Sequence, residues 1–514
     1  MTGVRAGPKL ATMPSTIDEA NEVTLQARTA VDSRRCAVLI FLVFSFFYLM
    51  TSSGRVRTMD EYMTFFETES MVLRHSTAVP QALQLNYFYG EYDPRGEPRA
   101  PYSPGQPLFA APWYVIGHSV LVRFPGVPAS ASDMVLKAAA CFSSAFFSAA
   151  VVAFLFLISN ALGLDLRQSF FTAAIVGLAT PVFAYSSWFY SEPLTTAFMV
   201  AAAYFVFARH IGELVPIRSA TIGGLLLGLA VFVRPVHAMA AAVFFAALLL
   251  RDRAKAIWPA LMLGIVSAMG LAALLLYNFH LFGNALDFGY PAVAEGGKRL
   301  IGFKTPILTG LYGFLLSPGK SIFLFAPPLI LAIFGIPRLW RKDRGLATVA
   351  AMTLTVYLIF FVPYTQWEGG YCVGPRYVVP TLGLLCIALA PMIGDMSKRT
   401  RVAAIALTIL GAAVQIISIA TSFMESQVPA GVYYNSNWTY QLSYSLWSQV
   451  RVLAHHLTNR APARLGLGFD RWFVFLAKAG VSHTTLLGMF CVMAIGAILS
   501  AEALRRTLKQ SESH

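Results

Sequence analysis

Two adjacent carboxylates, Asp60 and Glu61, follow directly after the first apolar run of the chain, within the segment RTMDEY at 57–62. Charged groups are costly next to hydrocarbon, so an acidic pair at the mouth of a span is expected to face water, a partner or a substrate. A carboxylate in that position can serve as a general base. The alternative is a capping box, in which Thr58 and Glu61 satisfy free backbone amides at a helix start. The capping box accounts for Glu61 but leaves Asp60 without a structural role.

Four more charged or titratable residues stand at the predicted ends of apolar runs. Glu192 begins one of them, where a first-turn acid that complements the helix dipole is the structural alternative. Arg234 and His237 bracket a tight turn between two apolar runs, and an arginine there is costly unless it meets an anion. Lys320 precedes a predicted helix start, which suits a cation only if an anion shares the site.

The segment WEGGYCVGPRY at 367–377 combines aromatic rings, an acid, three glycines and an arginine. Trp367 and Tyr371 offer surfaces on which a sugar ring can stack, and Glu368 offers a hydrogen-bond acceptor. Arg376 offers a bidentate contact to a phosphate. This mixture is typical of a site that holds a sugar phosphate.

Composition decides which elements position these residues. With 514 residues, 57% of them hydrophobic and 12% charged, and a mean hydropathy of +0.62, the chain cannot be a water-soluble globule. A membrane-spanning helix needs about 20 mostly apolar residues. We predict an all-α polytopic membrane protein with about 12 transmembrane helices. The runs lie near 36–53, 134–158, 169–186, 193–208, 219–233, 237–250, 257–277, 320–337, 346–363, 376–393, 402–422 and 484–503.

The basic residues predict the orientation in the membrane, because lysine and arginine concentrate in short cytoplasmic loops. With the N-terminus inside, the clusters at 34–35, 251–255, 338–344, 398–401 and 505–509 all fall on the inner side. We therefore expect both termini to be cytoplasmic, with a disordered tail over 1–35, a transmembrane domain over 36–503 and a second tail over 504–514. The net charge of +14 reflects this topology and attraction to membrane lipids, and nucleic acid is not an expected partner.

The long loops all lie on the outer side, over 54–133, 278–319 and 423–483. Such one-sided loops are typical of an enzyme that builds the walls of a substrate cavity there. Within the first loop, 107–122 is apolar but short, and we expect an interfacial helix, because a further span would place the arginine-bearing loops on the wrong side. The active site is thus expected on the outer face.

The order of these features resembles the GT-C superfamily of membrane glycosyltransferases, especially the branch related to protein O-mannosyltransferases and lipid A aminoarabinose transferases. The resemblance covers most of the chain in topology and is sharpest at the Asp60-Glu61 pair, at the YSPG segment 102–105 and at 367–377. It implies transfer of a sugar from a polyprenyl-phosphate donor to a lipid, glycan or protein acceptor. It further implies inversion at the sugar carbon and, for a bacterial chain, a place in the inner membrane.

The resemblance also implies roles for the candidate residues. Asp60 carries over as the general base, with Glu61 beside it in the catalytic pair. One departure is Gln106, because relatives in the aminoarabinose branch have a lysine there, so the contact to the donor phosphate must come from elsewhere. The candidates for that contact are Lys320 and Arg376, followed by Arg99 and Arg234. The candidates for sugar or acceptor binding are Glu192, His237, Trp367, Glu368 and Tyr371.

A divalent metal is the one cofactor to consider, since some GT-C members use one. Asp60 and Glu192 could hold Mg²⁺ or Mn²⁺, and their spacing does not distinguish a base from a ligand. No other metal-ligand spacing is present, and the five cysteines offer no disulfide framework.

The main alternative function is a transporter or a lipid or glycolipid flippase, since about 12 spans is also a common transporter size. That class predicts internal repeats and charged residues at the membrane midplane. Residues 1–260 and 261–514 show no repeat of each other, and the charges cluster at the ends of the spans. The sequence therefore favours an enzyme.

Overall fold

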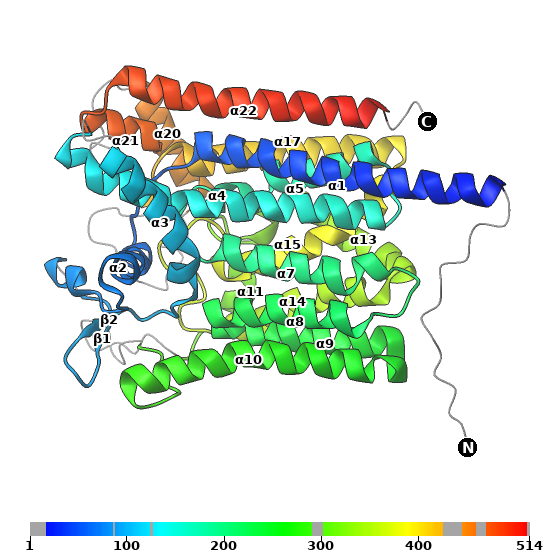
Figure 1. Ribbon diagram of the computed structural model, residues 1–514, viewed down its shortest axis with the longest axis horizontal. Coiled ribbons are helices and arrows are strands. Elements are labelled where there is room, and N and C mark those ends of the chain that lie inside the picture. The colour runs from blue at the N-terminus through cyan, green and yellow to red at the C-terminus, as the bar shows by residue number, and fades with distance from the viewer. Residues whose placement is uncertain are drawn as a thin grey trace.

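The computed structural model describes residues 17–85, 88–123, 127–289, 302–424, 445–458 and 469–510. The described chain is helical apart from one short hairpin, in which β1 (Glu91–Tyr92) pairs antiparallel with β2 (Pro98–Arg99). Long helices run side by side along one axis and form a bundle (Figure 1). The prediction of an all-α membrane protein is confirmed.

Each predicted apolar run falls on one or more helices. Seven segments are long and apolar enough to cross a membrane, and two shorter apolar helices, α5 and α8, accompany them within the described ranges. The count of about 12 spans stays a prediction. The helices of the bundle are α1 (Ile17–Thr51), α4 (Ala129–Ala161), α5 (Leu166–Ala179), α6 (Pro181–Tyr185), α7 (Glu192–Val206), α8 (Ile217–Val233), α9 (Ala238–Asp252), α10 (Ile257–Phe282), α13 (Leu329–Lys342), α14 (Arg344–Phe361), α15 (Val379–Leu385), α16 (Leu389–Gly394), α17 (Lys398–Ala420) and α22 (His483–Gln510).

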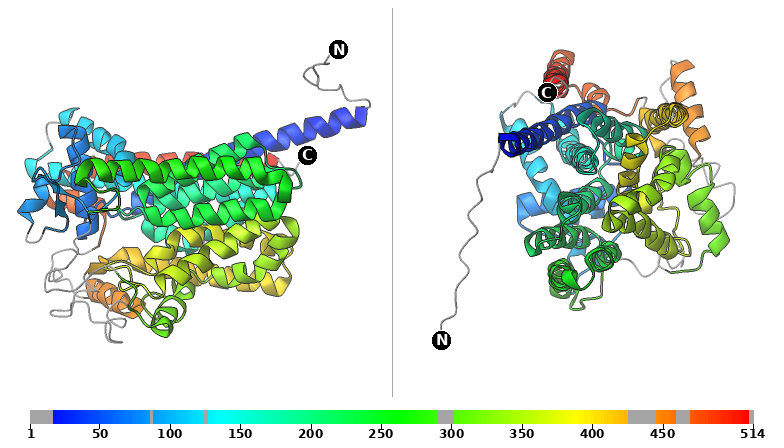
Figure 2. Two further views of the ribbon diagram at one scale, coloured as in Figure 1. Left: turned by 90° about the horizontal axis from the view of Figure 1, so that it is seen from below. Right: turned by 90° about the vertical axis from the view of Figure 1, so that its right-hand side faces the viewer.

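Shorter elements lie in the predicted outer loops. They are α2 (Met59–Arg74), the 3₁₀ turn η1 (Pro80–Gln84), α3 (Gly105–Arg123), α11 (Ile307–Leu315), α20 (Leu446–Thr458) and α21 (Trp472–Lys478). The short helix α12 (Ile322–Phe325) lies in the predicted apolar run 320–337. Figures 1 and 2 show α2, α3, the hairpin, α20 and α21 gathered at one end of the bundle, whereas α1 begins and α22 ends at the other. These elements of the predicted loops thus form a cap over one end, which we call the cap end.

The outside of the bundle is apolar, as a hydrocarbon solvent requires. Leu276, Ile359 and Leu499 are 69%, 70% and 65% exposed, and many other large apolar side chains on the helices are also exposed. Soluble monomers rarely leave apolar patches of this extent facing water. Together with the apolar helices, this surface identifies an integral membrane protein.

Small residues allow the closest helix contacts inside the bundle. Gly224 and Gly228 of α8 form a GxxxG pattern that packs on α10, where Gly224 meets Leu263 and Gly228 meets Gly270. A Cβ added at Gly270 would lie 2.0 Å from the carbonyl oxygen of Gly228. Association of helices in lipid depends on such close backbone approach, because apolar surface alone gives no advantage over contact with lipid.

The expectation of a disordered tail over 1–35 is wrong for residues 17–35, which form the N-terminal half of α1. This stretch is polar, but it holds neither glycine nor proline and consists largely of residues that tolerate a helix. Once the apolar part of α1 has nucleated, each added residue gains a backbone hydrogen bond without a further nucleation cost. Residues 1–16 lie outside the described ranges.

The link between α1 and α2 is anchored to the C-terminal part of the chain. Arg57 forms a buried ion pair with Asp470, and the two side chains are 2% and 1% exposed. The indole of Trp472 donates to the carbonyl of Leu49 over 3.0 Å. Gly54 has a φ of +60°, and a Cβ there would lie 2.4 Å from the Cβ of Trp472. The start of α2 is therefore held by residues near position 470.

Candidate active site

The predicted capping box is present at the start of α2. The hydroxyl of Thr58 accepts from the amide of Glu61 over 3.3 Å, and Glu61 Oε2 accepts from the amide of Thr58 over 3.0 Å. The same oxygen accepts from the amide of Arg57, and Oε1 accepts from the amide of Phe189, over 3.0 and 3.1 Å. Glu61 is fully buried. The structure thus uses both of its carboxylate oxygens to fix the first turn of α2.

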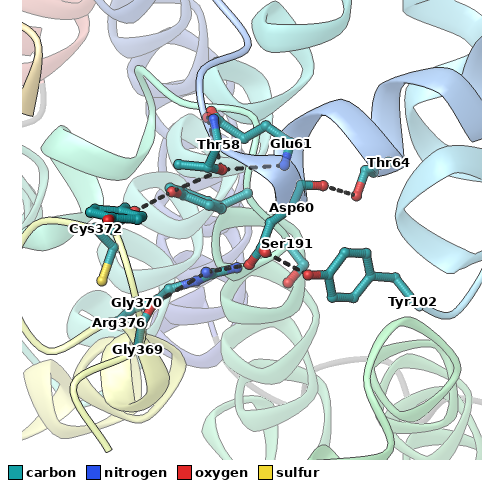
Figure 3. A network of polar contacts seen from close by, with 12 residues as sticks. Thr58, Asp60, Glu61, Thr64, Tyr102, Ser191, Gly369, Gly370, Cys372 and Arg376 are labelled. Carbon is teal, nitrogen blue, oxygen red and sulfur yellow. Dashed lines mark hydrogen bonds and ion pairs between the residues drawn. The ribbon is translucent and has the colours of Figure 1, made fainter. Parts of the chain in front are cut away.

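Asp60 points away from this cap toward two partners from distant segments (Figure 3). Oδ1 accepts from the hydroxyl of Tyr102 over 2.5 Å, and Oδ2 accepts from Nη1 of Arg376 over 2.6 Å. The Asp60 side chain is 29% exposed, whereas that of Arg376 is 4% exposed. Of the two adjacent acids, Asp60 is therefore the one that an approaching molecule can reach.

Arg376 stands between two carboxylates. Besides Asp60, its Nε donates to Oε1 of Glu192 over 2.9 Å, and the Glu192 side chain is 5% exposed. The guanidinium carbon lies 4.1 Å from the ring centre of Tyr190, a cation–π contact. Nη2 of Arg376 and Oε2 of Glu192 are buried and have no hydrogen-bond partner in the described parts of the chain. The guanidinium therefore keeps one donor that no described protein group uses.

These contacts set the protonation of Asp60. Burial acts to raise the pKa of its carboxyl group, but the charge of Arg376, the hydrogen bond from Tyr102 and the charge of Arg234 outweigh burial and hold the pKa below its usual value. Asp60 is thus ionised at neutral pH, as a base must be. A carboxylate so strongly stabilised is, however, a weak proton acceptor until Arg376 turns to another anion.

Arg234 lies beside this group at the end of α8, where the predicted turn is the 3₁₀ turn η3 (Pro235–His237). Its Nε donates to the hydroxyl of Ser191 over 2.7 Å, and its guanidinium lies 5.4 Å from the ring centre of Tyr102. The YSPG segment explains this neighbourhood, because a Cβ at Gly105 would lie 2.7 Å from the Cα of Val233. A residue without a side chain lets the start of α3, and with it Tyr102, pack directly on the end of α8.

The loop before Arg376 needs its glycines. Gly369, Gly370 and Gly374 have φ values of +76°, +68° and +63°, in the region that residues with a side chain rarely adopt. Lys320 binds this loop, since its Nζ donates to the carbonyl of Cys372 over 2.9 Å and to that of Gly370 over 3.4 Å. Lys320 is 2% exposed. The structure thus places Lys320 among carbonyl oxygens of the loop and not beside Asp60.

Two aromatic candidates of the 367–377 segment differ in position. The backbone carbonyl of Tyr371 accepts from the hydroxyl of Tyr190 over 2.8 Å, which links the loop to the ring under Arg376. Trp367 is 6% exposed, and its ring packs on Phe314 and against Gly313. The expectation that Trp367 offers a stacking surface is therefore wrong, because its ring fills the core next to α11.

The structure gives two further candidates, Arg99 and His237, partners other than Asp60. Arg99 donates to Asp93 from Nε and Nη2, over 3.1 and 2.7 Å, inside the first loop. His237 is 3% exposed, and its Nδ1 lies 2.6 Å from the hydroxyl of Tyr357. Glu368 is partly buried, and burial raises the pKa of its carboxyl group.

Sequence reasoning missed the carboxylate of Glu67. It lies two helical turns after Asp60 on α2, is 1% exposed and accepts from the hydroxyl of Tyr277 over 3.2 Å. Its second oxygen has no partner among the described residues, and burial raises the pKa of Glu67 to about 8. A spacing of seven places both acids on one face of a helix, which is the signal that could have found it.

A metal site is not evident at this group. Among the described residues, no three or more His, Cys, Asp or Glu side chains are placed to hold an ion together. Asp60 and Glu192, the proposed pair of ligands, both bind the guanidinium of Arg376. Arg376 thus occupies the position between the two acids that a divalent cation would need.

Comparison with known proteins gives distant structural neighbours. No family model and no curated protein sequence matches the chain. Among solved structures, ArnT from Cupriavidus metallidurans bound to undecaprenyl phosphate matches with 14% identity and a TM-score of 0.45, over 92% of this chain and 76% of ArnT. Its apo structure gives 13% and 0.45, over 96% and 77%.

A third neighbour is the oligosaccharyltransferase of Archaeoglobus fulgidus in its apo form. It matches with 12% identity and a TM-score of 0.41, over 79% of this chain and 60% of that protein. All the TM-scores lie below 0.5, so the function proposed below rests on the side-chain contacts of this chain.

Proposed function

We propose that this protein is a membrane glycosyltransferase that moves a sugar from a polyprenyl-phosphate donor to an acceptor hydroxyl. The observation that carries the proposal is the group formed by Asp60, Arg376 and Glu192, in which one accessible carboxylate contacts an arginine with an unused donor. A base and an anion-binding cation in direct contact are what displacement of a lipid phosphate by a hydroxyl requires.

Asp60 is the general base in this proposal. The acceptor hydroxyl gives its proton to the Asp60 carboxylate while its oxygen forms a bond to the anomeric carbon of the sugar. The bond from that carbon to the phosphate oxygen breaks, and its electron pair leaves with the lipid phosphate. Attack from the side opposite the phosphate inverts the configuration at the sugar carbon.

Arg376 takes up the charge of the leaving phosphate. Its unused Nη2 is available to a phosphate oxygen, and Nη1 can turn from Asp60 to a second oxygen, which gives a bidentate contact. Arg234, whose charge already acts on Asp60, is the second cation. Donor binding would thus draw Arg376 away from Asp60 and raise the pKa of the base at the moment it is needed.

The remaining candidates acquire supporting roles. Glu192 fixes the guanidinium of Arg376 through Nε, and Lys320 fixes the loop that carries it. Tyr102, Glu368 and Tyr371 are the polar groups that we assign to sugar or acceptor contacts. Glu61 positions Asp60 through the cap of α2 and does not itself take part in proton transfer.

We further propose that charge compensation at this site comes from arginine and not from a divalent metal, because Arg376 already binds both acids that a metal would need. The cap end of the bundle would face the outer side of the membrane. This orientation is supported by the basic residues at the opposite end, which include Arg251, Arg341 and Arg344. In a bacterium the membrane would be the inner membrane.

The test is sugar transfer by the purified protein in lipid nanodiscs, with a panel of labelled polyprenyl-phosphate sugars and a crude membrane extract as the source of acceptors. Transfer that disappears in Asp60→Asn supports the proposal. Movement of intact donor across a sealed bilayer, without transfer, would establish the flippase alternative instead. If the wild type transfers sugar and Asp60→Asn does so at the same rate, Asp60 is not the base.

A further inference from the structure

A charged cavity lies at the end of the bundle opposite the candidate active site. It is open to the surface and has a volume of about 340 Å³ where α13 passes into α14, next to the end of α9 and to the connection between α7 and α8. Its lining includes Arg251, Trp340, Arg341, Lys342 and Arg344. The transfer reaction proposed above uses none of these residues.

Two of the three acids that line the cavity, Asp343 and Asp252, are already engaged, and the third, Glu213, is 77% exposed at the surface. Asp343 accepts from the amide of Leu346 over 2.8 Å, as the N-cap of α14, and its other oxygen lies 2.9 Å from Nε of Arg251. Asp252 accepts from the amide of Val215 over 3.1 Å. The exposed cations of the lining therefore outnumber the acids that remain to neutralise them.

Arg251 lies deepest among these cations, and its side chain is 8% exposed. Its Nη2 donates to the backbone carbonyls of His210 and Glu213, the latter over 3.0 Å. Its Nη1 is buried and has no hydrogen-bond partner within the described ranges. A buried guanidinium donor without an acceptor is costly, so this group is better satisfied when an anion enters the cavity.

The rim of the cavity has the character of a membrane interface. Trp340 is 42% exposed and Leu214 is 53% exposed, and the guanidinium of Arg344 lies 6.0 Å from the ring of Trp340. Tryptophan beside arginine and lysine is typical of residues at the level of lipid headgroups. The rim therefore has the composition expected of a surface at headgroup level.

We propose that this cavity binds a phosphate group, held by Arg341, Arg344 and the unused donor of Arg251, and that its occupant is the headgroup of an anionic phospholipid. Basic pockets between helices at a membrane surface recognise phosphate in this way, and each cation near the surface contributes about 1 kcal/mol. A soluble phosphate ester presents the same chemistry and is the second source to be distinguished. The proposal does not depend on the glycosyltransferase function.

The experiment is native mass spectrometry of the delipidated protein in detergent, titrated with phosphatidylglycerol, phosphatidylcholine or glycerol phosphate. The cavity variant carries Arg341→Gln and Arg344→Gln, both of which replace exposed side chains. The matched control carries Arg505→Gln and Arg506→Gln, two exposed arginines at the same end of the bundle outside the cavity lining.

We expect phosphatidylglycerol to bind the wild type and the control alike, and the cavity variant roughly 30-fold more weakly, from two lost cations. Phosphatidylcholine should bind the wild type, the control and the cavity variant more weakly than phosphatidylglycerol binds the wild type. Saturation by glycerol phosphate alone at the affinity of the lipid would overturn the lipid assignment in favour of a soluble ester. Equal phosphatidylglycerol affinity in the cavity variant and the control would overturn the site, and unchanged melting temperatures show that both variants are folded.

Discussion

Replacing Asp60 by asparagine separates its chemistry from its structural role. Asparagine keeps an oxygen that can accept from Tyr102, and the buried guanidinium of Arg376 keeps Glu192 as a counter-charge. The hydrogen bond lost to a charged group contributes about 1.5–3 kcal/mol in a buried setting. With the Asp60 side chain 29% exposed, solvent screening reduces this to roughly 1 kcal/mol. The melting temperature should therefore fall by only a few degrees.

Activity should respond far more strongly. General base catalysis contributes about 10²- to 10⁴-fold, so the barrier should rise by roughly 3–5 kcal/mol in Asp60→Asn. The assay is initial-rate transfer of a labelled sugar in nanodiscs, paired with thermal unfolding of the same preparation. Under this reasoning, activity falls at least about 100-fold while the fold persists.

Glu61→Gln is the matched control for this variant. Glutamine can also serve in a capping box, but the charge that accepts from the amides of Arg57, Thr58 and Phe189 is lost. The control should therefore lose more stability than Asp60→Asn and keep more of its activity at a temperature where it is folded. Asp60→Asn turnover above a tenth of the wild-type rate, or a larger activity loss in Glu61→Gln, would refute the assignment of the base.

Four further predictions follow from the site. Arg376→Lys should raise the donor concentration needed for half-maximal rate about tenfold or more, because an ammonium cannot make a bidentate phosphate contact; an unchanged donor dependence would contradict the contact. The acid limb of the pH profile should lie at higher pH for kcat than for kcat/KM. Arg376 lowers the pKa of Asp60 in the free enzyme, whereas in the donor complex Arg376 binds the phosphate and no longer lowers that pKa. Acid limbs at the same pH would contradict this movement of Arg376 from Asp60 to the phosphate. Glu67 has a pKa raised to about 8 in the folded state, so its contribution to stability is fully present below pH 4.5 and is lost as the pH rises to about 8. Across that pH range the melting temperature of the wild type should decline more than that of Glu67→Gln. Equal declines in the two proteins would exclude Glu67 as the cause. Chelation of divalent ions should leave transfer unchanged, whereas loss of activity that Mg²⁺ or Mn²⁺ restores would show a metal in place of arginine charge.

Much of the architecture could be predicted from the sequence because the bilayer imposes a long and simple signal. About 20 consecutive apolar residues leave little choice but a helix, and each predicted run coincides with one or more. Local structure could also be predicted where it depends on only a few neighbouring residues. The capping box at Thr58 and Glu61 and the turn at 235–237 depend only on neighbours in sequence.

The pairings at the site could not be predicted in the same way. Arg376 meets Asp60 across 316 residues, and no spacing in the sequence states which cation faces which acid. In the sequence, Lys320 and Arg99 were candidates for the phosphate contact just as Arg376 was. In the structure, Lys320 binds loop carbonyls and Arg99 binds Asp93. Trp367 shows the same limit, since an aromatic residue in a loop suits a sugar or the core equally well until its neighbours are known.

The anchoring of α2 by the C-terminal segment has a consequence for biosynthesis. Arg57 and Asp470 are 413 residues apart, so the first helices enter the membrane long before the partner that secures the start of α2 has been translated. Until then only the capping box and the amide of Phe189 hold the start of the helix that carries Asp60. Catalytic competence should thus arise at the very end of synthesis, and a nascent or prematurely terminated chain would occupy the membrane without consuming activated sugar.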